Sequence, residues 1–78
     1  MNVFEKLSSE SKELQGDFLD FLRQGWNIIM FDETADGYSI LLTKGFKSLY
    51  FRKMQHQTYL VINNKIRKTY ENRKNQSY

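Results

Sequence analysis

The sequence predicts a single α+β domain in which an N-terminal amphipathic helix packs on an antiparallel β-meander of four to five strands. Apolar residues recur with the 3.6-residue period of a helix before Gly25, and the pattern then changes to the two-residue period of strands. Short segments rich in Gly, Asn and Asp separate the later apolar runs, as turns do. With 78 residues the chain has room for one core. We expect one domain over residues 1–70 and a polar, frayed tail at 71–78.

The helix is expected over residues 3–24. Its apolar stripe follows helical spacings and consists of Val3, Leu7, Leu14, Phe18, Phe21 and Leu22. Asn2, followed three residues later by Glu5, has the spacing of a capping box, and Gly25 suits the position after the last turn. Gly16 costs about 1 kcal/mol inside a helix, so a kink or a division into two helices there is the alternative.

The strands are expected at residues 26–34, 38–43, 49–54, 58–62 and 65–70. Asn63 and Asn64 both tolerate a positive φ and can form a tight turn before the last of these segments. Ile66 and Tyr70 are also four residues apart, so a C-terminal helix beginning near Asn64 is the alternative to the fifth strand.

Several strands carry consecutive apolar residues, such as Ile40, Leu41 and Leu42. Side chains of a strand alternate between the two faces of the sheet, so both faces are expected to be apolar. One helix covers only one face, and large apolar patches rarely stay uncovered. We therefore expect either a sheet that curls and closes or a homodimer formed through the second face.

Composition restricts the chemistry and the compartment. The chain has no cysteine, which excludes disulfides and fits a reducing environment. No apolar run approaches the roughly 18 residues of a membrane span, and the acidic N-terminal segment differs from a signal peptide. We expect a cytoplasmic protein with no membrane partner.

No constellation of catalytic or metal-binding residues is evident, and we expect neither an enzyme nor a cofactor. His56 is the one histidine and lies in a predicted turn, and one His without Cys cannot supply the usual zinc ligands. The acids Asp32, Glu33 and Asp36 lack the spacing of a calcium loop. Residues 44–47, Lys-Gly-Phe-Lys, join two strands and not a strand and a helix, so we interpret them as a turn and not as a phosphate-binding loop. A small nuclease using Lys, Arg, Tyr and a single His is the enzymatic alternative.

Charge is divided unevenly along the chain. Residues 1–40 contain three bases and eight acids (−5), whereas residues 41–78 contain nine bases and one acid (+8). This division favours an anionic partner.

In the basic half, Lys and Arg interleave with aromatic residues. This pattern is typical of nucleic-acid-binding surfaces, where Lys and Arg neutralise phosphates and the aromatic rings stack on nucleobases. The candidate nucleic-acid-binding residues are Tyr50, Arg52, Lys53, Lys65, Arg67, Lys68, Tyr70, Arg73 and Lys74. The alternative is that strands expose these charges for solubility and to prevent pairing at sheet edges.

The sequence thus predicts a small non-enzymatic binding module whose basic C-terminal half contacts an anionic partner, with nucleic acid favoured. One alternative is a small regulator or inhibitor that binds another protein through its acidic helix or an open sheet edge. Another is a structural subunit whose acidic and basic halves meet between copies.

Overall fold

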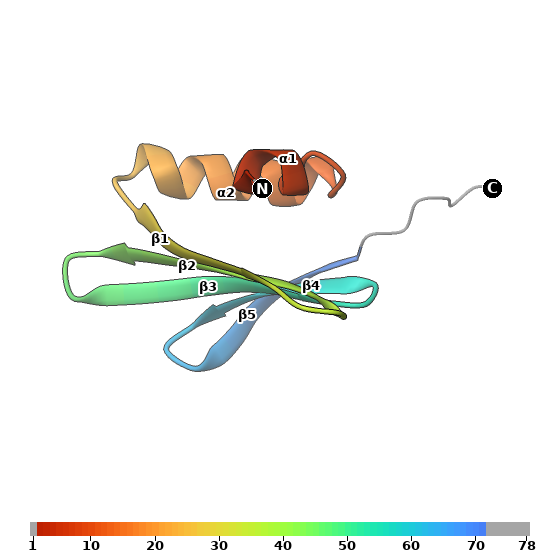
Figure 1. Cartoon of the computed structure of the whole chain (residues 1–78). Coiled ribbons are helices and arrows are strands. Elements are labelled where there is room, and N and C mark those ends of the chain that lie inside the picture. The colour runs from red at the N-terminus through yellow and green to blue at the C-terminus, as the bar shows by residue number, and fades with distance from the viewer. Residues whose placement is uncertain (1, 72–78) are drawn as a thin grey trace.

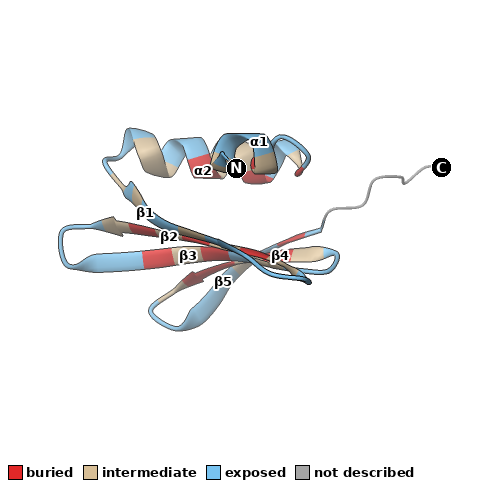
Figure 2. Cartoon of the chain, viewed as in Figure 1, coloured by how far each residue is buried: buried red, intermediate tan, exposed pale blue. Residues whose placement is uncertain are grey.

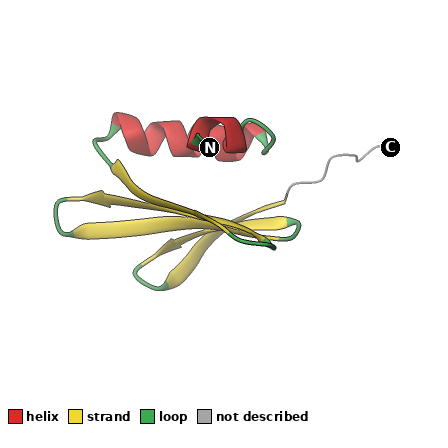
Figure 3. Ribbon diagram, in the orientation of Figure 1, coloured by secondary structure: helices red, strands yellow, loops and turns green. Residues whose placement is uncertain are grey.

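The computed structural model describes residues 2–71, which form two helices packed on one face of a five-stranded antiparallel sheet (Figures 1 and 3). The elements are α1 (Val3–Leu7), α2 (Lys12–Arg23), β1 (Asn27–Glu33), β2 (Gly37–Lys44), β3 (Lys47–Met54), β4 (Gln57–Ile62) and β5 (Lys65–Glu71). Each strand pairs with the next one along the chain, so the sheet is a meander. The predicted fold class is confirmed. Within residues 2–71 no helix has the length and apolar character needed to cross a membrane.

The predicted single helix over residues 3–24 is wrong, because the segment forms two helices. Their junction is not at Gly16, which lies inside α2, but at the polar residues 8–11. Ser11 is the N-cap of α2, and its side-chain oxygen accepts a hydrogen bond from the backbone N–H of Leu14 at 3.2 Å. Serine favours such capping over a position inside a helix, because its hydroxyl competes for backbone hydrogen bonds.

The outer helix ends follow the prediction. Asn2 is the N-cap of α1, and its side chain accepts a backbone hydrogen bond from the first turn. Gly25 has a φ of 101° and ends α2 in a Schellman motif, in which its N–H donates to the carbonyl of Leu22. The N–H of Trp26 donates to the carbonyl of Phe21, and the two rings pack edge to face with centroids 5.8 Å apart. This cap directs the chain from α2 into β1.

The fifth segment is a strand, as predicted, and not the alternative C-terminal helix. Asn63 and Asn64 have φ values of 55° and 62° and form a two-residue turn between β4 and β5. Two consecutive residues with positive φ produce the type of turn whose twist matches that of a hairpin. The shift of register between Leu60 and Val61 reflects a bulge in β5 near Arg67.

The core lies between the helices and one face of the sheet, where the buried segments of the strands lie beneath the helices (Figure 2). Its fully buried members come from α2 and the central strands, and the largest are Phe18, Phe51, Leu14, Ile40, Leu42 and Leu49. The apolar stripe predicted for the helix faces this core. Phe18 and Phe51 pack edge to face with centroids 5.6 Å apart, which joins the two layers.

The opposite face of the sheet, named here the open face, has no helix over it (Figure 1). β1 and β5 are the edges of the sheet and do not pair with each other, so the expected closure of the sheet is wrong. Leu41 and Val61 lie on the open face, whereas Phe31 pairs with the core residue Ile40 and lies on the helix side. Val61 is only 7% exposed, and its cross-strand neighbour is Tyr50. The expected homodimer stays a prediction.

Candidate nucleic-acid interface

Glu10 connects the helix layer to β2 and β3. This carboxylate is buried, with a side chain only 2% exposed, and its Oε2 accepts hydrogen bonds from Tyr38 Oη at 2.8 Å and Lys53 Nζ at 2.9 Å. Burial and, less strongly, the hydrogen bond to Glu10 raise the pKa of Tyr38. Lys53 therefore lies on the helix side of the sheet with its charge compensated.

A second polar cluster connects α2 to β5. Asp17 Oδ2 accepts hydrogen bonds from Lys68 Nζ and Tyr70 Oη, both at 2.7 Å, and Lys68 Nζ also lies 2.7 Å from Glu13 Oε2. Burial raises the pKa of Asp17, but the hydrogen bonds from Lys68 and Tyr70 together outweigh it and leave the pKa below its usual value. Hydrogen bonds to Asp17 and Glu13 raise the pKa of Lys68. Burial and then Asp17 raise the pKa of Tyr70.

Three of the nine sequence-predicted site residues thus face the helices. Lys53 and Lys68 form ion pairs, and Tyr70 is only 3% exposed. A buried ring offers no face on which a nucleobase can stack, and a paired ammonium gains less from a phosphate than a free one. Arg73 and Lys74 lie outside the described residues.

The other four predicted residues lie in two places. Tyr50 and Arg52 alternate with the core residues of β3, so they lie on the open face. Lys65 and Arg67 lie in the first half of β5 and are exposed. The structure brings Lys65 and Arg67 near two bases that the sequence analysis interpreted only as part of a turn.

These bases form the basic end of the sheet. In an antiparallel meander the β2–β3 and β4–β5 turns lie at one end, and the β1–β2 and β3–β4 turns lie at the other (Figure 1). The basic end is defined by four exposed residues that make no ion pair within residues 2–71, namely Lys44, Lys47, Lys65 and Arg67. The opposite end carries the acids Asp32, Glu33 and Asp36 around the β1–β2 turn. Part of the charge division along the chain thus becomes a division between two ends of one sheet.

Lys44 and Lys47 are directly opposite each other at the end of the β2–β3 hairpin. Like charges at a cross-strand position repel each other and destabilise the hairpin. No acid compensates this pair in the part of the chain that the structure describes. An anion bound between the two ammonium groups would relieve the repulsion.

Phe46 lies in the two-residue turn between these lysines and is fully exposed. Gly45, which precedes it, has a φ of 63°, a conformation that glycine adopts without strain. The turn therefore presents an aromatic ring to solvent between two ammonium groups. Sites on which nucleobases stack are built from exposed aromatic rings beside Lys and Arg side chains.

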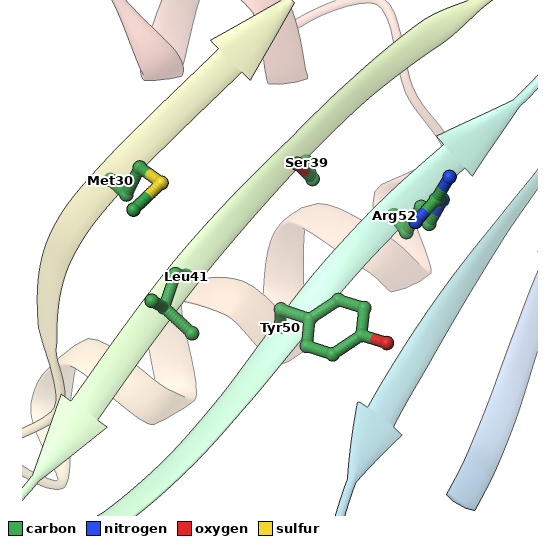
Figure 4. Close-up of a pocket in the computed structure, with 5 residues that line it drawn as sticks. All are labelled: Met30, Ser39, Leu41, Tyr50 and Arg52. Carbon is green, nitrogen blue, oxygen red and sulfur yellow. The ribbon is translucent and has the colours of Figure 1, made fainter. Parts of the chain in front are cut away.

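The open face contains a shallow pocket of about 210 Å³ (Figure 4). It is lined by Met30, Ser39, Leu41, Tyr50 and Arg52, which come from the three neighbouring strands β1, β2 and β3. Leu41 pairs with Tyr50 and Ser39 pairs with Arg52 in the register of β2 and β3. The pocket combines apolar, aromatic, hydroxyl and guanidinium groups.

The described residues contain no metal-binding cluster. There is no group of three or more His, Asp or Glu side chains placed to hold a metal ion within residues 2–71. His56 is exposed in the β3–β4 turn, with neither an ion pair nor a side-chain hydrogen bond among its described surroundings.

Lys44, Lys47 and Phe46 were not among the candidate site residues predicted from the sequence, although a signal was present. Residues on either side of a two-residue turn are cross-strand neighbours, so two lysines at these positions must face each other. Ser39 and Leu41 were also absent from those candidates. Once the core positions of β2 are known, the residues that alternate with them can be assigned to the other face.

Comparison with known proteins found no matching family model, no matching curated protein and no matching solved structure.

Proposed function

We propose that this protein is a non-enzymatic module that binds nucleic acid through the basic end of its sheet. The observation that supports the proposal is the gathering of four uncompensated bases on two adjacent hairpins. Four other bases are each paired with an acid, and these are Lys6, Arg23, Lys53 and Lys68. These four bases have acidic partners, whereas the four bases of the basic end have none within residues 2–71 and are free to meet an anion.

Phosphate backbones suit this surface better than an isolated anion does. Successive phosphates can contact Lys44 and Lys47 on one hairpin and Lys65 and Arg67 on the next. Each contact releases condensed counterions, so four contacts give a slope of log affinity against log salt of about −2.8 on single strands and −3.6 on duplex. Affinity should therefore fall roughly 50- to 150-fold between 50 and 200 mM salt.

The test compares binding of labelled DNA and RNA, single-stranded and duplex, by fluorescence anisotropy. The fourfold reversal of Lys44, Lys47, Lys65 and Arg67 to Glu is expected to abolish binding. Its urea midpoint should stay near that of the wild type, since these side chains are exposed. The proposal fails if the wild type binds none of these probes more tightly than about 100 μM near physiological salt, the weak limit of non-specific binding.

Single reversals with a matched control show whether position or net charge matters. Lys47→Glu and Lys12→Glu change the net charge equally. Lys12 is exposed at the start of α2, near the opposite end of the sheet (Figure 1). Lys47→Glu is expected to weaken binding several-fold more than Lys12→Glu. Equal losses would mean that the protein attracts nucleic acid by its overall charge alone.

A protein partner, including a second copy of this chain, is the second candidate function. The observation that favours it is the exposure of apolar side chains on the edge strands, with Met30 50% and Ile66 61% exposed. The acidic helix is less suited to this role, because Glu10, Glu13 and Asp17 already pair with Lys53 or Lys68. Sedimentation velocity between about 1 and 100 μM tests self-association, and a concentration-independent monomer would remove the homodimer.

A further inference from the structure

We infer that the open face is a stacking platform for a single-stranded nucleic acid, in which Tyr50 and Arg52 hold one nucleobase over the pocket that they form with Ser39, Leu41 and Met30. This inference rests on the proposed function and specifies its substrate class.

The lining of the pocket suits one planar heteroaromatic ring. Tyr50 contributes an aromatic ring, and Leu41 and Met30 contribute apolar contacts (Figure 4). A pocket of about 210 Å³ is smaller than the roughly 300–1,000 Å³ of sites for whole drug-sized ligands. Its size therefore favours a single ring system over a larger molecule.

The polar groups of the pocket match the rest of a nucleotide. Arg52 is exposed and forms no ion pair in the described part of the chain, so its guanidinium can stack on a ring or donate to a phosphate. The hydroxyl of Ser39, its cross-strand neighbour, can donate to or accept from a base edge. Every nucleobase has a π face, so stacking on Tyr50 tolerates any sequence.

The platform is continuous with the basic end. Tyr50 follows Lys47 by three residues of β3, about 10 Å along an extended strand. Thr43 and Ser48, which pair with each other, lie between Lys47 and Tyr50 along the hairpin, and like Tyr50 they belong to the open face. Beyond the pocket, Asp32 pairs with Ser39 and would repel further phosphates. A bound strand is therefore confined between the basic end and Arg52.

A ligand that contacts both the basic end and the pocket must be flexible. Lys44 lies two residues after the core residue Leu42, and Lys47 lies two residues before the core residue Leu49. Both lysines therefore project from the helix side of their hairpin, whereas Tyr50 projects from the open face. A chain that contacts both must turn around the β2–β3 hairpin, over Phe46. Single strands can make this turn, but duplex DNA is stiff over about 150 base pairs. This geometry favours single-stranded over duplex ligands.

The decisive experiment separates base stacking from phosphate contacts. The full chain is titrated with an eight-nucleotide oligothymidine and with an abasic oligomer of the same length and charge. Wild type is expected to bind the base-containing oligomer about 5- to 150-fold more tightly, the range for one stacked base. Tyr50→Ala should reduce this ratio to near one, while Tyr50→Trp should retain it.

Tyr59→Ala is the matched control, because Tyr59 lies on the open face but does not line the pocket. It should leave the ratio unchanged, and urea midpoints of all variants should verify that they are folded. Equal binding of the two oligomers by wild type, or an unchanged ratio in Tyr50→Ala, would overturn the platform and leave the proposed function standing. Failure of both oligomers to bind would overturn the proposed function itself. If the protein forms a dimer that buries the open face and does not prefer the base-containing oligomer, then this face binds a second copy of the chain.

Discussion

Replacing Glu10 with Gln is expected to destabilise the fold by about 2–3 kcal/mol, although the side chain keeps its size. The carboxylate accepts hydrogen bonds from Lys53 and Tyr38, and it is 2% exposed against 17% for the lysine side chain. The change therefore leaves an ammonium group at the edge of the core without a counter-charge.

The magnitude follows from these two hydrogen bonds. A hydrogen bond to a charged group contributes about 1.5–3 kcal/mol, and a neutral one contributes about 1 kcal/mol. The amide oxygen of Gln can still accept from Tyr38, so one bond becomes neutral and the other loses its charge partner. Lys53 can reach water in part, so the cost should stay below the 3–5 kcal/mol of a fully buried broken pair.

The assay is urea denaturation followed by Trp26 fluorescence and circular dichroism at pH 7. With an m value near 1 kcal/mol/M for a small domain, the midpoint should fall by roughly 2–3 M. Glu13→Gln is the matched control, because Glu13 also pairs with a lysine but its side chain is 62% exposed. Exposed pairs contribute little, so its midpoint should barely change. If Glu10→Gln shifts the midpoint no more than Glu13→Gln does, Glu10 does not stabilise Lys53 as argued.

Three further predictions concern the same denaturation assay. Gly16→Ala should stabilise the protein by about 0.5–1 kcal/mol, because a methyl group there meets nothing within 4 Å and alanine favours the helix. Gly37→Ala should destabilise it by about 1–3 kcal/mol, because its Cβ would collide with a backbone carbonyl of β3. The two substitutions must change the free energy of unfolding in opposite directions, and changes of the same sign would contradict the argument. Phe18→Ala should cost about 3–5 kcal/mol, and Trp26→Ala clearly less, since Phe18 is 1% exposed whereas Trp26 is only partly buried. Equal losses of stability in the two variants would contradict the placement of Trp26 at the edge of the core. The pKa of Asp17 is lower in the folded protein than in the unfolded chain, where it is near 3.8. The ionised carboxylate therefore stabilises the fold above about pH 3.8, and this stabilisation is lost as the pH falls through the lower folded pKa. Stability should thus fall below about pH 4, and Asp17→Asn should flatten this dependence; an unchanged pH profile would contradict it.

The identity and order of the strands, and the face that the helix buries, were available from the sequence. The local signals were independent of distant contacts. Gly25 and the pair Asn63 and Asn64 have the positive φ values that their turns require. The spacing of Leu14 and Phe18 placed both on the stripe that packs on the sheet. Periodicity and turn chemistry depend on neighbours in the chain, so a linear pattern reveals them.

The division of the helix needed more than periodicity. Ser11 fills a gap in the apolar stripe, and the stripe alone is equally compatible with a continuous helix. Its hydroxyl instead caps α2, and the carboxylate of Glu10 beside it reaches Tyr38 and Lys53. The sequence placed the possible break at Gly16, where propensity is lowest, but capping and a tertiary ion pair decided its position.

The availability of Lys53 and Lys68 was decided by tertiary structure alone. Lys53 meets Glu10 across 43 residues of sequence, and Lys68 meets Asp17 across 51. In the sequence these lysines are indistinguishable from Lys47 and Lys65, which have no such partner in the described fold. The sequence by itself determined that the C-terminal half carries excess positive charge. Which bases are neutralised depended on the acids that the helix layer brings over the sheet, because Coulomb attraction and hydrogen bonding act over distances in space and not along the chain.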